Sequence, residues 1–452
     1  LVGIIMARFL FPSDYGLIAM LSIFLGISAI FIDGGFTAAL IQKKNRTEID
    51  FSTIYYFNIF ASILIYCILF FTAPLISLFY DLPELTIITR VISLNLIISS
   101  FSAVSRTKLT IDVDFKTQAK VSFISVIISG ITGLFMAYYN YGVWALITQS
   151  LLNTLFQTIL FFYFVRWKPL FLFSVDSFKS LFSFSSKLVA SQLISTIYAN
   201  LYSLVIGKKF NSYELGVYSR AEAFSQFPTT NISAVLSRVT FPVLSSISDD
   251  NLRLKNIYVK YLKFTSFIVF PIMFFLIIIA NPLVELLLTD KWIDTVVILQ
   301  ILCLGFMWDP ISVLNINLLY VKGQSKAILQ LELVKKTFAI IILLISLPFG
   351  IIYIAIGRAF YSFIAVYINS HFTKKILKFS YFDQLKLFSP YFILSIVISL
   401  ATYYLSLFIY GITFKLVFSF IFYFLFFILF SYLFKFDELN IIRDFIKKKI
   451  TK

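Results

Sequence analysis

The sequence predicts an all-α integral membrane protein with about fourteen transmembrane helices, arranged as two six-helix lobes in parallel repeat plus two C-terminal helices. Of its 452 residues, 60% are hydrophobic and only 13% are charged, whereas soluble domains carry roughly 25% charged residues. So few charges cannot cover the surface of a soluble protein of this size, which excludes soluble enzymes, nucleic-acid binders and secreted disulfide scaffolds. The other two observations are a series of apolar segments about 20 residues long, the length that crosses a bilayer, and an internal repeat.

The apolar segments predict fourteen spans. We interpret the first, residues 1–10, as the end of a truncated helix. The weakest is 221–247, which contains Glu222, Asn231 and Arg238. In order, the predicted spans are 1–10, 17–41, 54–79, 87–104, 121–139, 143–165, 181–206, 221–247, 262–288, 296–320, 331–348, 351–370, 391–409 and 416–434.

The net charge of +16 is explained by topology. Most of the 38 Lys and Arg residues fall in alternate connections and in the C-terminal tail. Since cytoplasmic loops carry the excess of Lys and Arg, both termini are expected in the cytoplasm. The tail, 436–452, is a basic amphipathic segment expected to lie on the anionic inner leaflet.

The internal repeat appears when the chain is aligned with itself. At an offset of 200 residues, 7–16 falls on 207–216, so that a cation, an acid and a glycine coincide; at an offset of 208, 73–76 falls on 281–284. Six helices per repeat give the two halves the same orientation, and transporters of this kind carry substrate between such halves. The predicted domains are an N-lobe at 1–170, a C-lobe at 171–386, two further spans at 387–435 and the tail.

The sequence offers no catalytic or metal-binding constellation. It contains two Cys and one His, too few for a disulfide framework or a His-based metal centre. It also lacks the glycine-rich phosphate loop of ATP-driven transporters. We therefore expect no enzyme activity and no cofactor.

Ionisable residues in or beside the spans are the candidate site, because an ionised side chain at the bilayer centre costs about 3 kcal/mol or more and usually faces a cavity. The cations exceed the acids, so a cavity lined by them would attract an anionic group such as a diphosphate. For several of them the alternative is that they extend to the membrane interface. The acids either couple transport to an ion or pair structurally. The candidate cations are Arg8, Arg90, Lys187, Arg220, Arg238 and Arg358, and the candidate acids are Asp33, Glu222 and Asp309.

Six intramembrane amides complete the polar set. We expect most of them to form interhelical hydrogen bonds, and one or two to contact sugar hydroxyls. They are Asn58, Asn95, Asn153, Asn200, Asn315 and Asn317.

Several motifs resemble those of Wzx-type polysaccharide flippases, most closely the branch associated with lipopolysaccharide or teichuronic-acid export. Residues 7–17 match the pattern A-R-x-L-x-P-x-D-Y-G-L, which closes the first helix of that family. The resemblance extends from residue 1 to about residue 370 and includes 33–44, 50–53, 141–146, 238–247 and 299–317.

The resemblance implies membership of the multidrug/oligosaccharidyl-lipid/polysaccharide exporter superfamily. It implies a V-shaped cavity between two six-helix lobes and transfer of undecaprenyl-diphosphate-linked oligosaccharide from the inner to the outer leaflet of the bacterial inner membrane. It also implies an H⁺ or Na⁺ gradient as the energy source, cavity cations of which Arg8 is the best match, and polymerase or other assembly proteins as partners.

Two other classes remain as alternatives. A drug or small-metabolite antiporter of the same superfamily would favour an acidic cavity, because many drugs are cations, and the cation excess argues against it. A membrane glycosyltransferase, ligase or polymerase would be expected to have a large outer loop with catalytic groups, and the predicted outer loops are short.

Overall fold

The computed structural model describes residues 2–440 and residue 443, without the side chains of Lys187 and Ser325. Within these residues every regular element is a helix, and each of the predicted spans coincides with one helix or with two consecutive helices. Eleven helical segments of the described chain are long and apolar enough to cross a bilayer. The predicted all-α membrane fold is therefore confirmed. The predicted spans outside these eleven are the ones at 1–10, 221–247 and 331–348.

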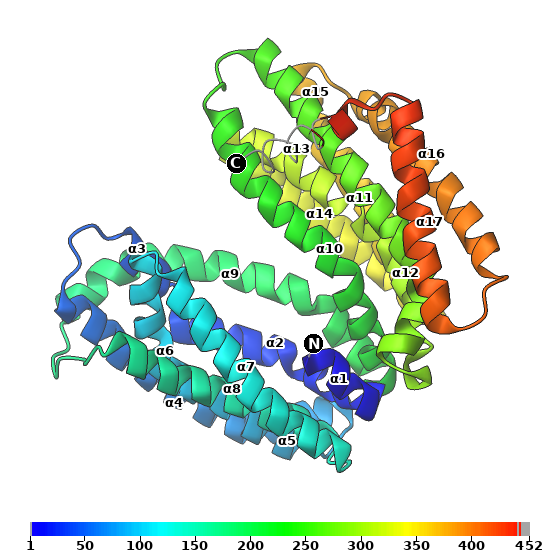
Figure 1. The fold of residues 1–452 in the computed structure, drawn as a ribbon. Coiled ribbons are helices and arrows are strands. Elements are labelled where there is room, and N and C mark those ends of the chain that lie inside the picture. Colours follow the sequence, from blue (N-terminus) through cyan, green and yellow to red (C-terminus); the bar gives the residue numbers. More distant parts are fainter. Residues whose placement is uncertain (1, 441–442, 444–452) are drawn as a thin grey trace. The chain divides into compact units, whose positions relative to one another are not determined.

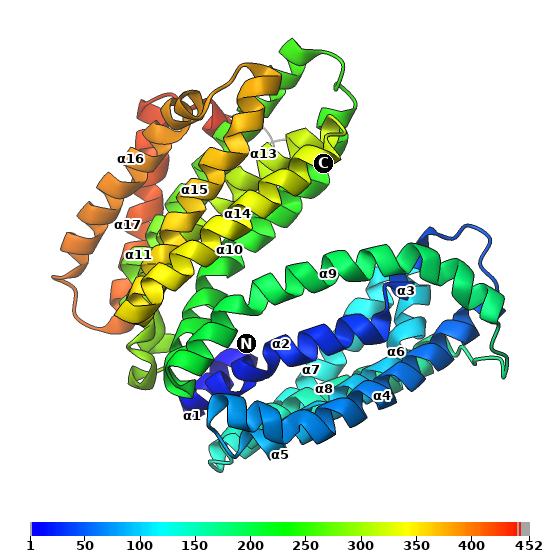
Figure 2. The same ribbon diagram turned by 180° about the vertical axis from the view of Figure 1, so that it is seen from behind.

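The chain divides into two compact units, Leu1–Ser219 and Arg220–Lys452. In the first unit α2 and α9 run side by side, as do α7 and α8 (Figure 1, Figure 2). Its helices are α1 (Val2–Phe9), α2 (Pro12–Asp33), α3 (Phe36–Gln42), α4 (Glu48–Tyr80), α5 (Leu85–Ile92), α6 (Leu94–Ile111), α7 (Phe115–Tyr138), α8 (Val143–Val165), α9 (Val175–Lys209) and the start of α10 (Ser212–Ser245).

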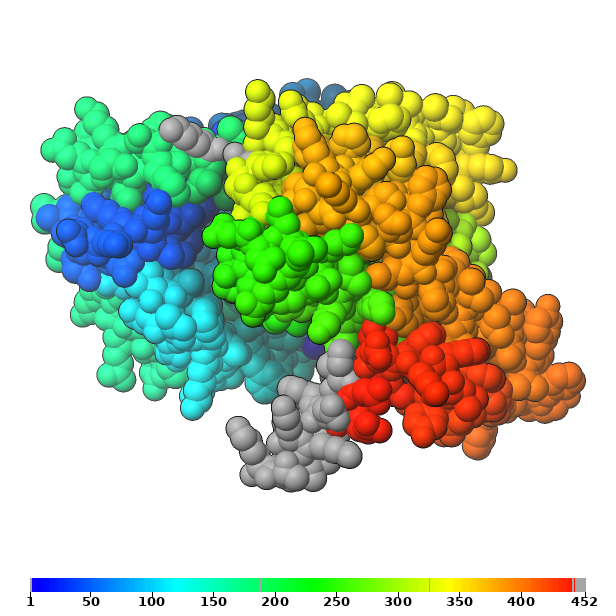
Figure 3. Space-filling model, turned by 90° about the horizontal axis from the view of Figure 1, so that it is seen from above, coloured from blue at the N-terminus to red at the C-terminus, as the bar shows by residue number. Residues whose placement is uncertain are grey.

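The second unit contains the rest of α10 and the remaining helices. In the space-filling view, the end of α17 (red) lies against α16 (orange) (Figure 3). The helices of this unit are α11 (Asn251–Leu287), α12 (Thr295–Phe306), α13 (Asp309–Val321), α14 (Ser325–Ser346), α15 (Ile351–Leu377), α16 (Tyr381–Ser406) and α17 (Ile412–Leu433), with short 3₁₀ turns at Asp290–Trp292 and Leu347–Phe349. The lobe limits predicted from the sequence stay predictions, and most of the predicted tail segment lies outside the described residues.

Helix packing follows the rules of membrane bundles. On α7 the buried positions are mostly small, among them Ser125, Ser129 and Ala137, and small residues let α8 approach closely. In the first turn of α7, Thr117 donates hydrogen bonds to Asp114, the N-cap residue, from its hydroxyl and its backbone N–H, which holds the pKa of Asp114 below its usual value. Large apolar side chains such as Phe71, 75% exposed, cover the outside, as expected of a surface that contacts lipid.

Three of the spans are interrupted helices. The break between α2 and α3 falls at Gly34 and Gly35, both with positive φ (54° and 72°), a conformation that glycine adopts without strain. The break between α5 and α6 falls at Ser93, and the one between α12 and α13 at Met307–Trp308. The last two interrupt the fourth span of each repeat, and interrupted helices at corresponding positions of two repeats are a good pointer to a transporter's binding region.

The repeat is visible in one close contact within the first unit. A Cβ atom added to Gly16 would lie 1.7 Å from the backbone oxygen of Ser212, and one added to Gly216 would lie 1.8 Å from that of Pro12. Gly16 and Pro12 correspond to Gly216 and Ser212 at the offset of 200 residues. Equivalent residues of the two repeats are thus in reciprocal contact: i contacts j, and the equivalent of j contacts the equivalent of i.

Candidate functional site

The first unit contains a cavity of about 390 Å³ with a mostly polar lining. It is formed by α2, α3, α4, α6 and α8. Asp33, Asn58 and Arg106 line it together with several Ser and Thr hydroxyls and Gln157. Other cavities of this unit are lined almost wholly by apolar side chains, so this one differs from the grooves that lipid tails would fill.

Asp33 reaches the cavity because α2 ends there. It is the last residue of α2, and its Oδ1 accepts a hydrogen bond of 2.5 Å from the Thr37 hydroxyl on α3. The Thr107 hydroxyl oxygen on α6 lies 3.5 Å from that of Thr37. The glycine break thus turns the carboxylate toward α6, where Arg106 lines the same cavity. That Arg106 shares a cavity with Asp33 could not be read from the spacing of the sequence.

The second unit holds a cluster of opposite charges inside the helical bundle. Glu222 on α10 and Asp309, the first residue of α13, are both attracted by the Arg358 guanidinium on α15. Gln226 also donates to Glu222 at 3.1 Å. Arg358 lies over the Phe306 ring, 4.9 Å from its centroid. The structure therefore brings three of the predicted site residues together.

A further cation belongs to this charge cluster. Lys335 on α14 is only 5% exposed, forms an ion pair with Glu332, and attracts Asp309. α14 spans Ser325–Ser346, so Lys335 lies near the middle of that helix. Its apolar stem and its acidic partners allow it to be buried there.

The remaining predicted cations are distributed over several helices. Arg8 on α1 and Arg238 on α10 are exposed. Arg90 on α5 donates from Nε to the backbone oxygen of Phe70 at 3.2 Å and lies 4.2 Å from the centroid of that ring, so it ties α5 to α4. Arg220 lies 5.5 Å from the centroid of the Trp292 ring. The side chain of Lys187 lies outside the described residues.

Some of the intramembrane amides form hydrogen bonds to helices, and others have a buried oxygen without a partner among the described residues. Asn315, fully buried, joins four helices: it accepts from Tyr258 and Thr373 and bonds Gln384. Asn317 and Asn95 also bond other helices, to Thr240 and Ser150. Asn200 bonds its own helix. Asn58 is different: it is 2% exposed, lines the polar cavity, and its Oδ1 has no hydrogen-bond partner among the described residues. Asn153 Oδ1 is likewise buried without a partner there.

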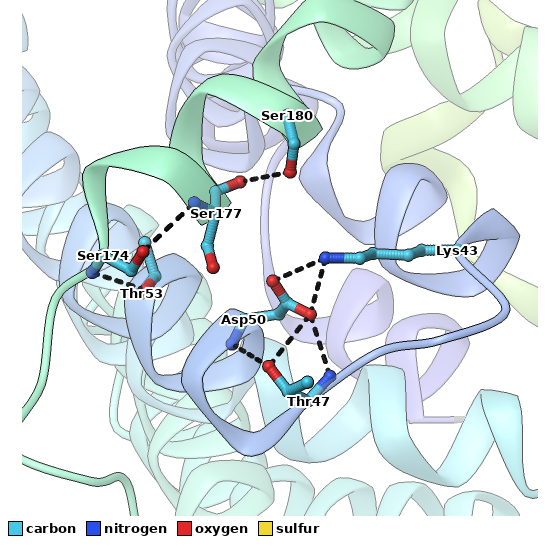
Figure 4. Close-up of polar contacts among 7 residues, drawn as sticks. All are labelled: Lys43, Thr47, Asp50, Thr53, Ser174, Ser177 and Ser180. Atoms are coloured by element: carbon cyan, nitrogen blue, oxygen red, sulfur yellow. Dashed lines mark hydrogen bonds and ion pairs between the residues drawn. The ribbon is translucent and has the colours of Figure 1, made fainter.

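A polar clamp at the start of α4 explains another motif that the sequence singled out. Asp50, 1% exposed, pairs with Lys43 at 2.7 Å and accepts from the backbone of Thr47 (Figure 4). Beside it, the backbone N–H of Ser174 donates to the Thr53 hydroxyl at 3.1 Å. These bonds fasten the segment before α9 to α4, so the motif at 50–53 has a structural role here.

Comparison with known proteins agrees with this architecture. Residues 5–297 match a family described as polysaccharide biosynthesis protein. The teichuronic acid biosynthesis protein TuaB of Bacillus subtilis is 26% identical over 66% of this chain and 62% of its own length. The lipopolysaccharide biosynthesis protein WzxC of Escherichia coli is 24% identical over 66% and 61%. The alignments thus span about three fifths of the length of these two relatives.

Solved structures share the fold. The lipid II flippase MurJ in an inward closed conformation superposes with a TM-score of 0.75 at 17% identity, covering 95% of this chain and 96% of MurJ. A multidrug resistance MATE family transporter superposes with a TM-score of 0.64 at 15% identity, covering 83% and 94%. The family match spans well over half of the chain, and the family resemblance seen in the sequence is confirmed: the chain belongs to the polysaccharide biosynthesis protein family.

Proposed function

We propose that this chain is a flippase that moves an undecaprenyl-diphosphate-linked oligosaccharide from the cytoplasmic to the outer leaflet of the bacterial inner membrane. The observation that carries the proposal is the set of ionisable and amide side chains held inside apolar helical bundles, above all Asp33, Glu222 and Arg358. Such groups are costly in a membrane unless they face water, a partner or a substrate. The names of the similar proteins support a polysaccharide substrate rather than a drug.

The substrate has an anionic diphosphate, so cations are the natural contacts for it. Arg8 and Arg238 are exposed on helices of an integral membrane protein, and an unpaired cation is disfavoured against lipid. A guanidinium offers two parallel hydrogen bonds to phosphate oxygens. We assign Arg8 and Arg238 to the diphosphate, while Arg90 serves to join α4 and α5. Lys187 and Arg220 remain candidates for the same role.

An ion gradient would drive the cycle, with no cofactor. In the second unit Glu222 and Asp309 are both attracted by the positive charge of Arg358. Binding of H⁺ or Na⁺ to one of these carboxylates would change the charge balance of the cluster, and with it the packing of α10, α13 and α15. This links an ion to a conformational step. Polymerase and other assembly proteins would act on the transported product.

Complementation of a flippase-null strain tests the function. The wild-type chain should restore polymer export and lower the lipid-linked precursor that accumulates on the cytoplasmic side. The triple variant Arg8→Ala, Arg238→Ala, Arg358→Ala should abolish export, and the corresponding Lys variants should restore only part of it. Normal export by a triple Ala variant present at wild-type levels would contradict the role of these cations.

The proposed topology has both termini in the cytoplasm. Reporter fusions after Leu288 and after Lys322 should give periplasmic and cytoplasmic signals respectively. The opposite pattern would reject this orientation.

A further inference from the structure

The polar cavity of the first unit has the hydrogen-bonding character of a site for a ligand rich in donors. Its Ser and Thr hydroxyls give their single proton to nearby protein oxygens: Ser99 to the Leu96 carbonyl at 3.1 Å, Thr107 to Ala103 at 2.9 Å and Thr154 to Ser150 at 3.1 Å. A hydroxyl has one donor and two acceptor lone pairs. Once the proton is used, each oxygen can offer only lone pairs to the cavity.

Two further groups add to this acceptor surface. Asn58, only 2% exposed, lines the cavity, and its Oδ1 is buried without a hydrogen-bond partner among the described residues. A buried acceptor without a partner costs about 1–3 kcal/mol, so a ligand donor that reached this oxygen would remove that cost. Asp33 contributes a carboxylate whose Oδ1 already accepts from Thr37.

The charged side chains that line the cavity limit the kind of ligand it can bind. A bare cation would suit the carboxylate and the carbonyl, but Arg106 lines the same cavity and would repel it. An anion would suit Arg106 and be opposed by Asp33 and the hydroxyl oxygens. A neutral polyol can satisfy both sides, because each of its hydroxyls donates to one group and accepts from another.

The volume of the cavity also favours a small polyol as the ligand. About 390 Å³ lies in the range of roughly 300–1,000 Å³ typical of small-molecule sites. At about 30 Å³ per water molecule, the cavity has room for roughly a dozen water-sized groups, which is the scale of one sugar ring with its hydroxyls.

We propose that this cavity binds one sugar residue of the transported glycolipid, through Asn58, Asp33, Arg106 and the hydroxyls of α6 and α8. The inference rests on the proposed flippase function and adds to it a site in the first unit that reads the oligosaccharide separately from the diphosphate. Sites that hydrogen-bond a substrate hydroxyl discriminate strongly against analogues that lack it, so this cavity would contribute to sugar specificity.

Binding to the purified full chain in nanodiscs tests the site. The probes are the lipid-linked oligosaccharide extracted from a flippase-deficient strain and undecaprenyl diphosphate without sugar. Asn58→Leu and Thr154→Val should each weaken binding of the sugar-bearing lipid at least tenfold and leave binding of the sugar-free lipid unchanged. Thr132→Val is the matched control, because Thr132 donates to its own helix in the same way at 3.2 Å and does not line the cavity.

Each outcome has a defined meaning. Equal losses for both lipids, or no loss for either, would overturn the sugar site and leave the flippase function standing. The same holds if the wild type binds both lipids equally well, because the sugar then adds no affinity. If the wild type binds neither lipid, the proposed function fails and the sugar site fails with it.

A second experiment does not depend on Asn58→Leu, the larger of the two substitutions. In a Cys67→Ser background, Ser99→Cys introduces a thiol of nearly the same size at the cavity, and the other native cysteine, Cys303, is buried. The sugar-bearing lipid should slow maleimide labelling of Cys at position 99 several-fold, and the sugar-free lipid should not. Equal protection by both lipids, or protection by neither, would overturn the assignment.

Discussion

The polar cavity of the first unit and the charge cluster of the second differ in how they satisfy polar groups inside an apolar bundle. Both lie beside the interrupted fourth span of their repeat: the cavity is lined by α6, and Asp309 opens α13. In the cavity, hydroxyls and amides surround open space together with Asp33 and Arg106. In the cluster, Glu222 and Asp309 are attracted by Arg358, and Asp309 also by Lys335.

The physical reason for the difference is the cost of an unpaired group. A neutral hydroxyl that donates to its own helix can face a hydrated cavity at little cost. A charge inside the bundle needs an opposite charge close by, which draws the helices together. The two units thus differ in chemistry: the cavity of the first suits a neutral ligand, and the charge cluster of the second suits the proposed response to an ion.

The largest expected effect concerns the reciprocal contacts of Gly16 and Gly216. Gly16→Ala and Gly216→Ala should each prevent accumulation of folded protein, at a cost of at least about 3 kcal/mol for overpacking. The added Cβ meets a backbone carbonyl, which cannot move aside as a side chain can. Size-exclusion profiles and melting temperatures of the detergent-solubilised variants provide the measurement.

Gly3→Ala is the control for both glycine variants, since nothing lies within 4 Å of its added Cβ. It should behave as the wild type. A large effect at only one of the two glycines would argue against the reciprocal contact.

The second effect concerns charge pairing. Arg358→Ala should destabilise the protein by about 3–5 kcal/mol, because it leaves carboxylates uncompensated inside the bundle. Adding Glu222→Gln should recover part of this loss. In the first unit, Arg106→Ala should cost less than about 1 kcal/mol, because Arg106 is exposed and exposed charges contribute little to stability.

Thermal unfolding of these variants measures the contrast. Equal destabilisation by Arg358→Ala and Arg106→Ala would remove the distinction between a paired cluster and an open cavity. No recovery on adding Glu222→Gln would show that Arg358 acts through packing, such as its contact with Phe306, and not through charge.

These contrasts show which features the sequence could reveal. Apolar segments of bilayer length located the spans well; the predicted segment 143–165 coincides with α8. The two glycines predicted a weak point in the second span, and the helix breaks there. The break at Ser93 has no glycine or proline to mark it; it depends on packing.

The candidate sites were harder to predict because partners come from distant parts of the chain. Lys335 was not among the candidate cations, because the Asp309 carboxylate that it attracts lies on another helix, α13. Asn58 belonged to a group of six similar amides, and only the structure shows that its oxygen lacks a partner while Asn315 has several. Composition can show that polar groups lie in the membrane, but it cannot show which of them satisfy each other.

The third expected effect concerns the polar clamp at Asp50, which belongs neither to the cavity nor to the charge cluster. Asp50→Ala removes the acid that accepts from the Thr47 backbone in the capping box of α4, a loss of about 0.5–2 kcal/mol, and leaves Lys43 without its acid. We expect a loss of about 2 kcal/mol in stability, with the preference for sugar-bearing over sugar-free lipid unchanged in the protein that folds. Loss of that preference in a well-folded Asp50 variant would mean that the clamp shapes the cavity. Asp112→Ala, an acid of the same unit that does not cap α4, serves as the control.

The smallest effect compares two threonines one turn apart on α8. Thr158, 6% exposed, donates to the Ile98 carbonyl at 3.1 Å and to Ser102 at 3.2 Å, and so joins α8 to α6. Thr154 donates only within its helix and lines the cavity. Thr158→Val should therefore cost about 1 kcal/mol of stability and leave sugar binding intact. Thr154→Val should change stability by no more than about 0.5 kcal/mol and yet impair export. Thr158→Val should thus lower the melting temperature more than Thr154→Val does, whereas Thr154→Val should lower the export rate more. If both substitutions lower stability and export together, the cavity is part of the helix packing and its polar lining is not a binding surface.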